Sequence, residues 1–381
     1  MTTGYNHRVM ERRRFLRTAG TAGAIALAGC LGGPEGDADG AASDSPTATA
    51  PSTPTASPAP SGTLTVATYS SFTGEGTAGT WLKGEFEAAY PDVTVEFVTP
   101  QNGVNQYIQR AQQGAPIDAD LYVGLNTGEL VRVDRELDDS LFLAVEDEIE
   151  GADAVKDGLR IDPDGRAVPY DTGYISLVYD EDEVENPGTF DALLEPAYED
   201  ALITQNAQQS DPGLAFLLWT IVNRGEDAYL DYWAGLLDNG VTILSDWEPA
   251  YNAYLAGEAP IVVSYSTDQV YYHGEGVDMA KHQVGFLDDQ GYANPEAMAV
   301  FADSDVPDLA TRFMEFVLRP ESQAGIAVRN VQFPAVEGVD PGEEFSRYAY
   351  EPPEPVTFTY EALAGNVSEW VDAWARQVAS R

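Results

Sequence analysis

The sequence predicts an α/β protein of two lobes with a ligand cleft between them. Its 381 residues exceed the roughly 100–200 residues of one ordinary domain, even after an N-terminal leader is set aside. Strand-like and helix-like segments alternate from residue 63 onward, which is typical of α/β folds. Apolar residues make up 44% and aromatic residues 10% of the chain, enough for packed cores and an aromatic-lined cleft.

The elements of the first lobe follow from hydrophobic periodicity. Residues 63–69 and 93–97 alternate apolar and polar side chains and predict strands, with a helix over 81–90 between them. Another helix is expected over 104–111. The apolar run 119–125 predicts a buried parallel strand, so the folded part begins as a βαβ unit.

Later segments complete the two lobes. They are strands at Val168 and over 174–179, a largely apolar helix over 212–222, a buried strand over 261–265, and helices over 309–317 and 363–378. We assign residues 63–170 to the first part of lobe 1, 171–266 to lobe 2, and 267–381 to the return into lobe 1 with the C-terminal helices. In such folds ligands bind where loops meet at the carboxyl ends of strands.

The first 62 residues predict export and a lipid anchor. Three arginines, 12–14, precede a small apolar run over 19–29, too short for a membrane span of about 20 residues and typical of a twin-arginine leader. The motif LAGC at 27–30 resembles a lipobox, in which Cys30, the single cysteine, carries the lipid. Residues 31–62 are rich in Gly, Asp, Ser, Thr, Ala and Pro, a composition that predicts a disordered tether. We expect the protein on the extracellular face of the cell membrane, lipid-anchored and without a membrane span.

The charge balance favours a protein that works in concentrated salt. Twenty basic and 63 acidic residues give a net charge of −43, spread along the whole chain. Screening over about 3 Å at 1 M salt removes the self-repulsion that this charge creates. No basic stripe exists to neutralise phosphates, so nucleic-acid binding is excluded.

The motifs of common enzymes are absent from the sequence. It contains no P-loop, no Gly-x-Ser-x-Gly elbow and no His-Glu-x-x-His motif. A glycine pattern, GEGTAG at 74–79, lies too far beyond the first strand for a dinucleotide site and is interpreted as a turn into a helix. The spacing of His273 and His282 supports no catalytic triad, and His282 is expected to be exposed to solvent.

Aromatic, hydroxyl and acidic residues cluster instead at the ends of predicted strands. They include Tyr69, Ser70, Asp171, Ser210, Trp247, Tyr265 and Tyr271. Aromatic faces with nearby carboxylates suit a flat cationic ring, each face-on contact contributing roughly 0.5–2 kcal/mol. The pattern therefore favours a binding site for a small organic cation.

Several motifs together resemble the thiamine-binding proteins of bacterial ABC importers, from about residue 64 to the C-terminus. They are TYSSF at 68–72, ADLYVGL at 119–125, VPYDTGY at 168–174 with VYD at 178–180, SDPGL at 210–214 with LLW at 217–219, WEPAY at 247–251 with LAGE at 255–258, and SYST at 264–267. The resemblance implies a type II periplasmic-binding fold with a hinge between the lobes, a thiamine-like ligand, permease partners, no cofactor and no enzymatic activity. We expect a monomer.

The resemblance also implies roles for residues at matching positions. Tyr69, Trp247, Tyr265 and Tyr271 would contact the thiamine rings. Ser210 would meet the hydroxyethyl or phosphate end. Asp120 and Asp171 lie in matching motifs, where each acts either in the site or in the scaffold, and Ser70 is a further candidate contact.

Two positions depart from the family pattern. Asn126 stands where the family has an acid, and Val331 stands where it has a tryptophan. Gln332, Phe333 or Tyr272 would have to compensate. The ligand is therefore thiamine, a thiamine phosphate, a pyrimidine fragment or a related solute.

Three alternatives stay open at this point. Tyr271, Tyr272 and His273 resemble the adjacent tyrosines of ferric-ion-binding proteins on the same fold, whose hard oxygen ligands suit iron. A lipid-anchored extracellular hydrolase is a second alternative, and an adhesive surface module is a third.

Overall fold

The computed structural model describes residues 60–381, which form one unit of the chain. The twin-arginine leader, the lipid anchor at Cys30 and most of the tether fall on residues 1–59 and lie outside the described residues. Within residues 60–381, every helix falls short of the length and hydropathy needed to cross a membrane.

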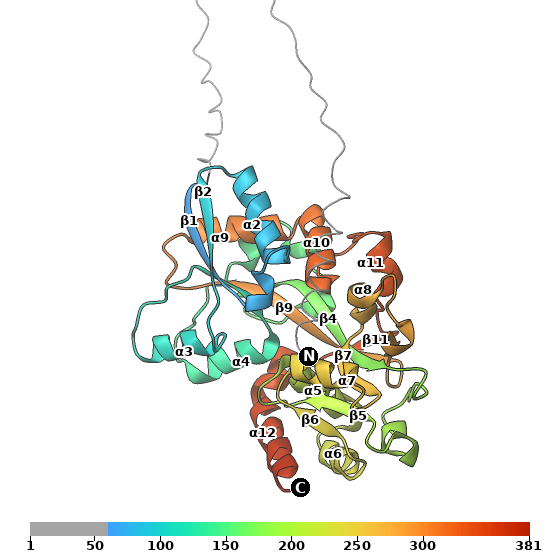
Figure 1. Ribbon diagram of the computed structural model, residues 1–381. Coiled ribbons are helices and arrows are strands. Elements are labelled where there is room, and N and C mark those ends of the chain that lie inside the picture. The colour runs from blue at the N-terminus through green and yellow to red at the C-terminus, as the bar shows by residue number, and fades with distance from the viewer. Residues whose placement is uncertain (1–59) are drawn as a thin grey trace, which may run out of the picture. The chain divides into compact units, whose positions relative to one another are not determined.

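One mixed sheet of eleven strands organises residues 60–381 (Figure 1). Eight strands lie side by side in the order β2-β1-β3-β9-β4-β7-β5-β6, while β8 and β10 pair with β4, and β11 pairs with β9. Their bounds are β1 Gly62–Ala67, β2 Val93–Val98, β3 Leu121–Leu125, β4 Ala167–Tyr179, β5 Leu202–Gln205, β6 Thr242–Leu244, β7 Ile261–Tyr265, β8 Gln283–Gly285, β9 Gln290–Val300, β10 Phe333–Pro334 and β11 Glu354–Val356.

Two parallel groups of strands are joined by an antiparallel pair. Strands β2, β1 and β3 run parallel to one another, as do β7, β5 and β6. Between these groups, β9 and β4 run antiparallel to each other and to their outer neighbours β3 and β7. The long strands β4 and β9 therefore connect the two halves of the sheet.

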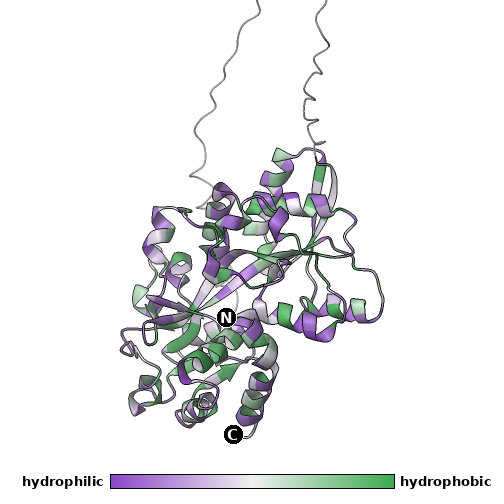
Figure 2. Cartoon of the chain, turned by 180° about the vertical axis from the view of Figure 1, so that it is seen from behind, coloured by the Kyte–Doolittle hydropathy of each residue, from purple (hydrophilic) through white to green (hydrophobic). Residues whose placement is uncertain are grey.

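Helices cover both halves of this sheet. Their bounds are α2 Ala78–Ala89, α3 Asn105–Gln112, α4 Thr127–Glu136, α5 Asp211–Arg224, α6 Tyr229–Asp238, α7 Trp247–Leu255, α8 Asp268–Tyr272, α9 Pro307–Val317, α10 Pro320–Ile326, α11 Glu343–Tyr348 and α12 Tyr360–Ala379. The shorter helical segments include two 3₁₀-helices, η2 Ser70–Phe72 and η8 Met279–His282, and a π-helix, η9 Ala327–Val331. Helices in Figure 2 carry both hydrophilic and hydrophobic residues along their length, as amphipathic helices do.

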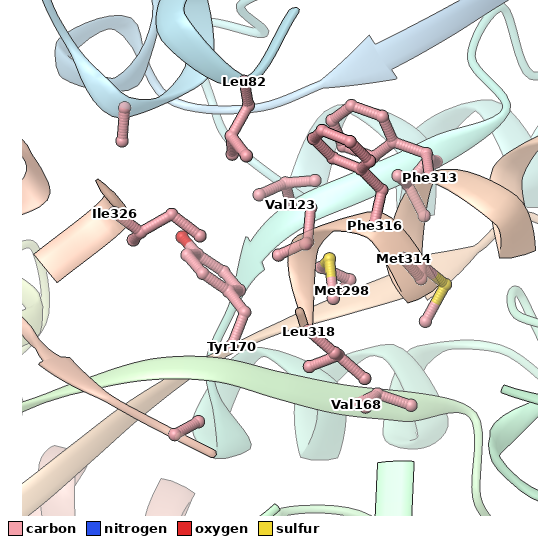
Figure 3. Packing of buried hydrophobic residues seen from close by; sticks show 14 of the residues in the cluster. Leu82, Val123, Val168, Tyr170, Met298, Phe313, Met314, Phe316, Leu318 and Ile326 are labelled. Carbon is pink, nitrogen blue, oxygen red and sulfur yellow. The ribbon is translucent and has the colours of Figure 1, made fainter. Parts of the chain in front are cut away.

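Each half of the sheet has its own hydrophobic core. Figure 3 shows Val123 and Met298 gathered with Phe313 and Phe316 of α9 in the first cluster. The second cluster joins α5, α6 and α12, where Trp233 packs edge-on against Trp374 with ring centroids 5.4 Å apart. The two lobes expected from the sequence stay a prediction, with which these clusters on the two halves of the sheet are consistent.

The structure confirms the α/β class and most predicted elements, and it corrects others. Residues 261–265 form β7 as expected, and the C-terminal stripe forms α12. The two strands expected near 168 and 174–179 are one continuous strand, β4. The strand predicted over 119–125 is β3, and it has a parallel neighbour, β1, on one side only. Its other neighbour is β9, which the sequence did not predict and which pairs with it antiparallel.

Truncating Trp374 tests the anchoring of α12. Trp374 is 1% exposed, so Trp374→Ala leaves a large cavity and should lower the free energy of unfolding by about 3–5 kcal/mol. Denaturant unfolding followed by circular dichroism in molar KCl measures this. Glu369→Ala, exposed on the same helix, is the control and should stay within about 0.5 kcal/mol of the parent. Equal losses in the two variants would contradict the packing.

Candidate ligand-binding site

A bulge in β4 brings two of its side chains beside one residue of β9. Pro169 lies opposite Ala297, whereas Asp171 lies opposite Glu296, which leaves Tyr170 as an extra residue in β4. In a bulge, two residues of one strand face one residue of the other. Tyr170 and Asp171 therefore both lie next to Glu296.

Hydrogen bonds link these residues to the end of β1 and to η9. The hydroxyls of Tyr69 and Tyr170 donate to Oε2 of Glu296 at 2.8 and 2.5 Å. Asn330 Nδ2 donates to the Tyr69 hydroxyl at 3.0 Å and to Oδ2 of Asp171 at 2.7 Å. We call these five side chains the carboxylate cluster. Four separate segments of the chain supply it.

The carboxylate cluster holds acidic groups in a poorly solvated place. Burial raises the pKa of Glu296, and the hydroxyls of Tyr170 and Tyr69 oppose that rise. Burial first, and the charge of Glu296 second, raise the pKa of Asp171 well above its ordinary range. Oδ1 of Asp171 is buried and accepts no hydrogen bond from the described part of the chain. Bringing a cation close would stabilise the ionised form of both acids.

Glycines let aromatic rings approach the sheet closely around this cluster. A Cβ atom on Gly173 would lie 2.5 Å from the Tyr265 ring and 2.6 Å from Oε1 of Gln332. Gly124 has a φ of +100°, and a Cβ atom there would lie 2.6 Å from the Tyr69 ring. Tyr69, Tyr265 and Gln332 remain partly exposed, so a ligand can reach them.

The segment that carries Asn330 and Gln332 has a strained backbone. Val331 ends the π-helix η9 with a φ of +58°, a conformation that β-branched residues rarely adopt. Strained residues persist only where the surroundings fix them, and they gather at binding sites. Here the turn at Val331 separates Asn330, which bonds Asp171, from Gln332, which packs on Gly173.

A pocket lies between α4, α5 and β9. Its lining includes Asn126, Asp211 and Asn294 at polar positions, with Leu214 and Leu218 among the apolar ones. Asn294 lies two residues before Glu296 on β9, on the same face of the strand. Asn294 therefore links the lining of the pocket to the strand that carries Glu296.

Asn126 caps the helix that opens on this pocket. Its side chain accepts from the backbone N–H of Glu129 at 2.9 Å, and Glu129 accepts in return from the Asn126 N–H at 3.2 Å. Burial, then the charge of Asp211, raise the pKa of Glu129 to about 8. Ser210 precedes α5, and its buried hydroxyl has no partner in residues 60–381.

Trp247 and Tyr271 belong to a group of rings around α7 and α8. Trp247 begins α7, is partly exposed, and donates from Nε1 to the Ser264 hydroxyl at 3.0 Å. Tyr271 is 44% exposed and lies edge-on against Tyr272, with ring centroids 4.9 Å apart.

The structure brings together only some of the predicted site residues. Tyr69 and Asp171 both contact Asn330, while Tyr265 and Gln332 lie against Gly173, with Val331 beside Gln332. Asn126 and Ser210 lie at the helix ends near the pocket, Trp247 and Tyr271 lie on α7 and α8, and Ser70 is exposed in η2. Asp120 belongs to the scaffold, because its carboxylate accepts from Thr65 N and the Ser304 hydroxyl.

Sequence reasoning missed the centre of the carboxylate cluster and misplaced one histidine. Glu296, Tyr170 and Asn330 were not predicted as site residues, although Tyr170 belongs to the VPYDTGY motif at 168–174. His282 was expected to be exposed, but it is 4% exposed and paired with Asp268. The burial follows from its packing between α7 and α8, a tertiary effect that local polarity does not reveal.

The residues proposed for iron point to different partners. Tyr272 stacks on His282, whereas His273 stacks on Tyr348 and bonds Glu344 through Nε2 at 2.7 Å. No group of three or more His, Cys, Asp or Glu side chains suited to a metal ion occurs among the described residues.

The fold and the family match define a solute-binding protein. Residues 81–352 match the family described as bacterial extracellular solute-binding protein, and the chain belongs to that family. The fold is that of periplasmic solute-binding proteins, as the sequence predicted.

Several relatives of the chain are thiamine-binding periplasmic proteins. The chain is 30% identical to the thiamine-binding periplasmic protein of Escherichia coli K12 over 316 residues, 83% of this chain and 93% of that protein. The Haemophilus influenzae protein of the same name is 24% identical over 314 residues, covering 82% and 91%.

Solved structures agree on the fold. A periplasmic thiamin binding protein has a TM-score of 0.71 at 28% identity, covering 84% of this chain and 96% of that one. A ferric binding protein from Campylobacter jejuni has a TM-score of 0.66 at 17% identity, covering 82% and 99%, a likeness that shows the fold alone.

Adding a methyl group at Gly173 tests the close packing of the site. Gly173→Ala places Cβ against Tyr265 and Gln332, so these side chains must shift, and the free energy of unfolding should fall by about 1–3 kcal/mol. Gly84→Ala, in an open position of α2, is the control and should stabilise by about 0.5–1 kcal/mol. Chemical unfolding in molar KCl measures both. A neutral Gly173→Ala would contradict the packing.

The pH dependence of stability tests the burial of Glu129. Its folded-state pKa of about 8 lies above the ordinary 4.5, so its contribution is fully present below pH 4.5 and is lost as the pH rises through about 8. Glu129→Gln keeps an oxygen to accept from Asn126 and should make the decline between pH 4.5 and 8 shallower. Unfolding curves at stepped pH measure this. An identical slope in parent and variant would contradict the assignment.

Proposed function

We propose that this chain captures thiamine, a thiamine phosphate or a closely related solute for an ABC importer. The carboxylate cluster carries the proposal, because a buried acid, Asp171, and a half-buried acid, Glu296, lie among tyrosine rings at the junction of β4 and β9. The thiamine-binding relatives support the same ligand class. The protein binds its ligand and transforms nothing.

The chemistry of thiamine matches the cluster. Its thiazolium ring is flat and permanently cationic, so it can offset the charge of Glu296 and Asp171 without a proton. Tyrosine and tryptophan faces attract such a ring by roughly 0.5–2 kcal/mol each. The family has an acid at the position of Asn126. We propose that Glu296 takes over the role of that acid by supplying negative charge from β9.

We propose as ligand contacts the residues that were predicted from the sequence, together with Glu296. They are Tyr69, Ser70, Asn126, Asp171, Ser210, Trp247, Tyr265, Tyr271, Val331, Gln332 and Glu296. Tyr265 lies over Gly173, next to Gln332, and offers a ring face beside the cluster. Gln332 supplies a polar contact next to Val331, where the family has a tryptophan.

Capture also requires placement at the membrane and a movement of the lobes. We propose export by the twin-arginine route, a lipid anchor at Cys30, a tether over 31–62, and adaptation to molar salt. The lobes are 63–170 with 267–381, and 171–266, and they close about β4 and β9. The working form is a monomer that delivers its solute to the permease subunits.

The alternative functions have less support. Iron capture would need Tyr271, Tyr272 and His273 to converge, and His273 instead bonds Glu344. Addition of ferric iron should leave the protein colourless, since no tyrosinate charge-transfer band forms. For a hydrolase, the His282–Asp268 pair has Tyr251 as its third member rather than a serine.

Replacing the central acid tests the proposed ligand. Glu296→Gln keeps acceptors for the tyrosine hydroxyls but removes the charge, so thiamine affinity should fall at least about tenfold, as loss of a charged contact implies. Titration calorimetry in molar KCl measures affinity for thiamine, its phosphates and its pyrimidine half. Glu96→Gln, exposed on β2, is the control and should bind like the parent. Parent-like binding by Glu296→Gln would contradict a site centred on Glu296.

A further inference from the structure

Four rings form a stacked group of which Trp247 is the outer end, and within it the Tyr251 hydroxyl also lies 3.2 Å from Nδ1 of His282. Trp247 lies on Tyr251 with centroids 4.9 Å apart and an interplanar angle of 24°. Tyr251 lies on Tyr272 at 5.3 Å and 11°, and Tyr272 lies on His282 at 4.5 Å and 14°. The rings come from α7, α8 and η8, so the stack joins three segments that are separate in sequence.

Hydrogen bonds fix the inner end of this stack. The Tyr251 hydroxyl donates to Oδ1 of Asp268 at 2.5 Å, and Nδ1 of His282 lies 2.8 Å from Oδ2 of the same carboxylate. Asp268 is 6%, His282 4% and Tyr251 1% exposed. One buried carboxylate therefore holds two of the four rings at once.

The turn that carries His282 is held in place from three sides. Gln269 Nε2 of α8 donates to the His282 carbonyl at 2.7 Å, and the Tyr254 hydroxyl of α7 donates to the Lys281 carbonyl. The Lys281 ammonium lies 3.5 Å from the Asp180 carboxylate, next to the end of β4. These contacts leave His282 little freedom to tilt, and a fixed His282 fixes the rings stacked on it.

Trp247 is the outer, partly exposed member of the stack. One face lies on Tyr251, and its Nε1 donates to Ser264 of β7, so both the plane and the rotation of the indole are set. A ring that is already oriented loses less conformational freedom when a ligand stacks on it, which strengthens binding.

We propose that Asp268, His282, Tyr272 and Tyr251 are positioning residues that orient the Trp247 ring for the ligand. The inference rests on the proposed function, since it assumes that Trp247 contacts the solute. Asp268 and His282 act only through the stack and touch no ligand.

The chain offers a matched control for this role. His273 stacks on Tyr348 at 4.0 Å and 15° and bonds Glu344 at 2.7 Å, which repeats the histidine, tyrosine and carboxylate chemistry on a ring outside the Trp247 stack. His273→Gln should leave thiamine binding unchanged, whereas His282→Gln should weaken it.

The test is a double-mutant cycle read by calorimetry on the full chain. His282→Gln should weaken thiamine binding about tenfold when Trp247 is present, and less than about twofold in a Trp247→Phe background, because the coupling runs through the indole. Tyr272→Phe keeps the ring and should bind like the parent, while Tyr272→Leu should lose affinity like His282→Gln. Equal losses for His282→Gln in both backgrounds would overturn the proposal.

A ligand-free readout separates this inference from the function on which it rests. The emission of Trp247 is obtained by subtracting the Trp247→Phe spectrum from that of the parent, and His282→Gln should shift it to the red and increase its quenching by acrylamide. An unchanged Trp247 emission would overturn the positioning role even if thiamine binds. If the parent binds no thiamine while the emission shifts, the proposed function fails and the positioning of Trp247 stands.

Discussion

The antiparallel pairing of β4 with β9 is the constraint on which the rest of the site depends. It joins the two parallel halves of the sheet, and its bulge at Tyr170 sets two side chains of β4 against Glu296. Burying a carboxylate is costly unless hydrogen bonds or a counter-charge compensate. Two tyrosine hydroxyls compensate part of the cost at Glu296, and Asn330 does so at Asp171. On the proposed function, a cationic solute beside the two acids would offset the rest of this cost.

Salt affects the charge on the surface of the chain and the charge in the site differently. A net charge of −43 gives the surface a negative field, which salt screens, whereas the buried cluster is screened much less. We therefore propose that selection of a cation depends on Glu296 and Asp171 and persists in molar salt. In the proposed site the aromatic rings add shape selection to this charge selection, since Gly173 and Gly124 let the rings of Tyr265 and Tyr69 approach the sheet closely.

The sequence predicted the fold better than the site. The β-branched run of β7 and the helical stripe of α12 were found because their periodicity is local. β9 was not, since its Asn294, Pro295 and Glu296 resemble the start of a helix, where proline is favoured at the first position. Asp171 was proposed through its motif, whereas its neighbour Glu296 lies beside it because of a strand pairing that no local pattern encodes. The burial of His282 depends likewise on packing between segments that are distant in sequence.

Proton release on binding is the sharpest test of whether a cation binds beside Glu296 and Asp171. A cation beside the carboxylate cluster favours the ionised acids, whose pKa values burial has raised, so binding should lower those values and expel protons. Calorimetry of thiamine binding at pH 7, in molar KCl and in two buffers of different ionisation enthalpy, measures the number of protons exchanged. Our account predicts net release from the parent and less release from Glu296→Gln. Binding with no proton exchange, or with proton uptake, would contradict it.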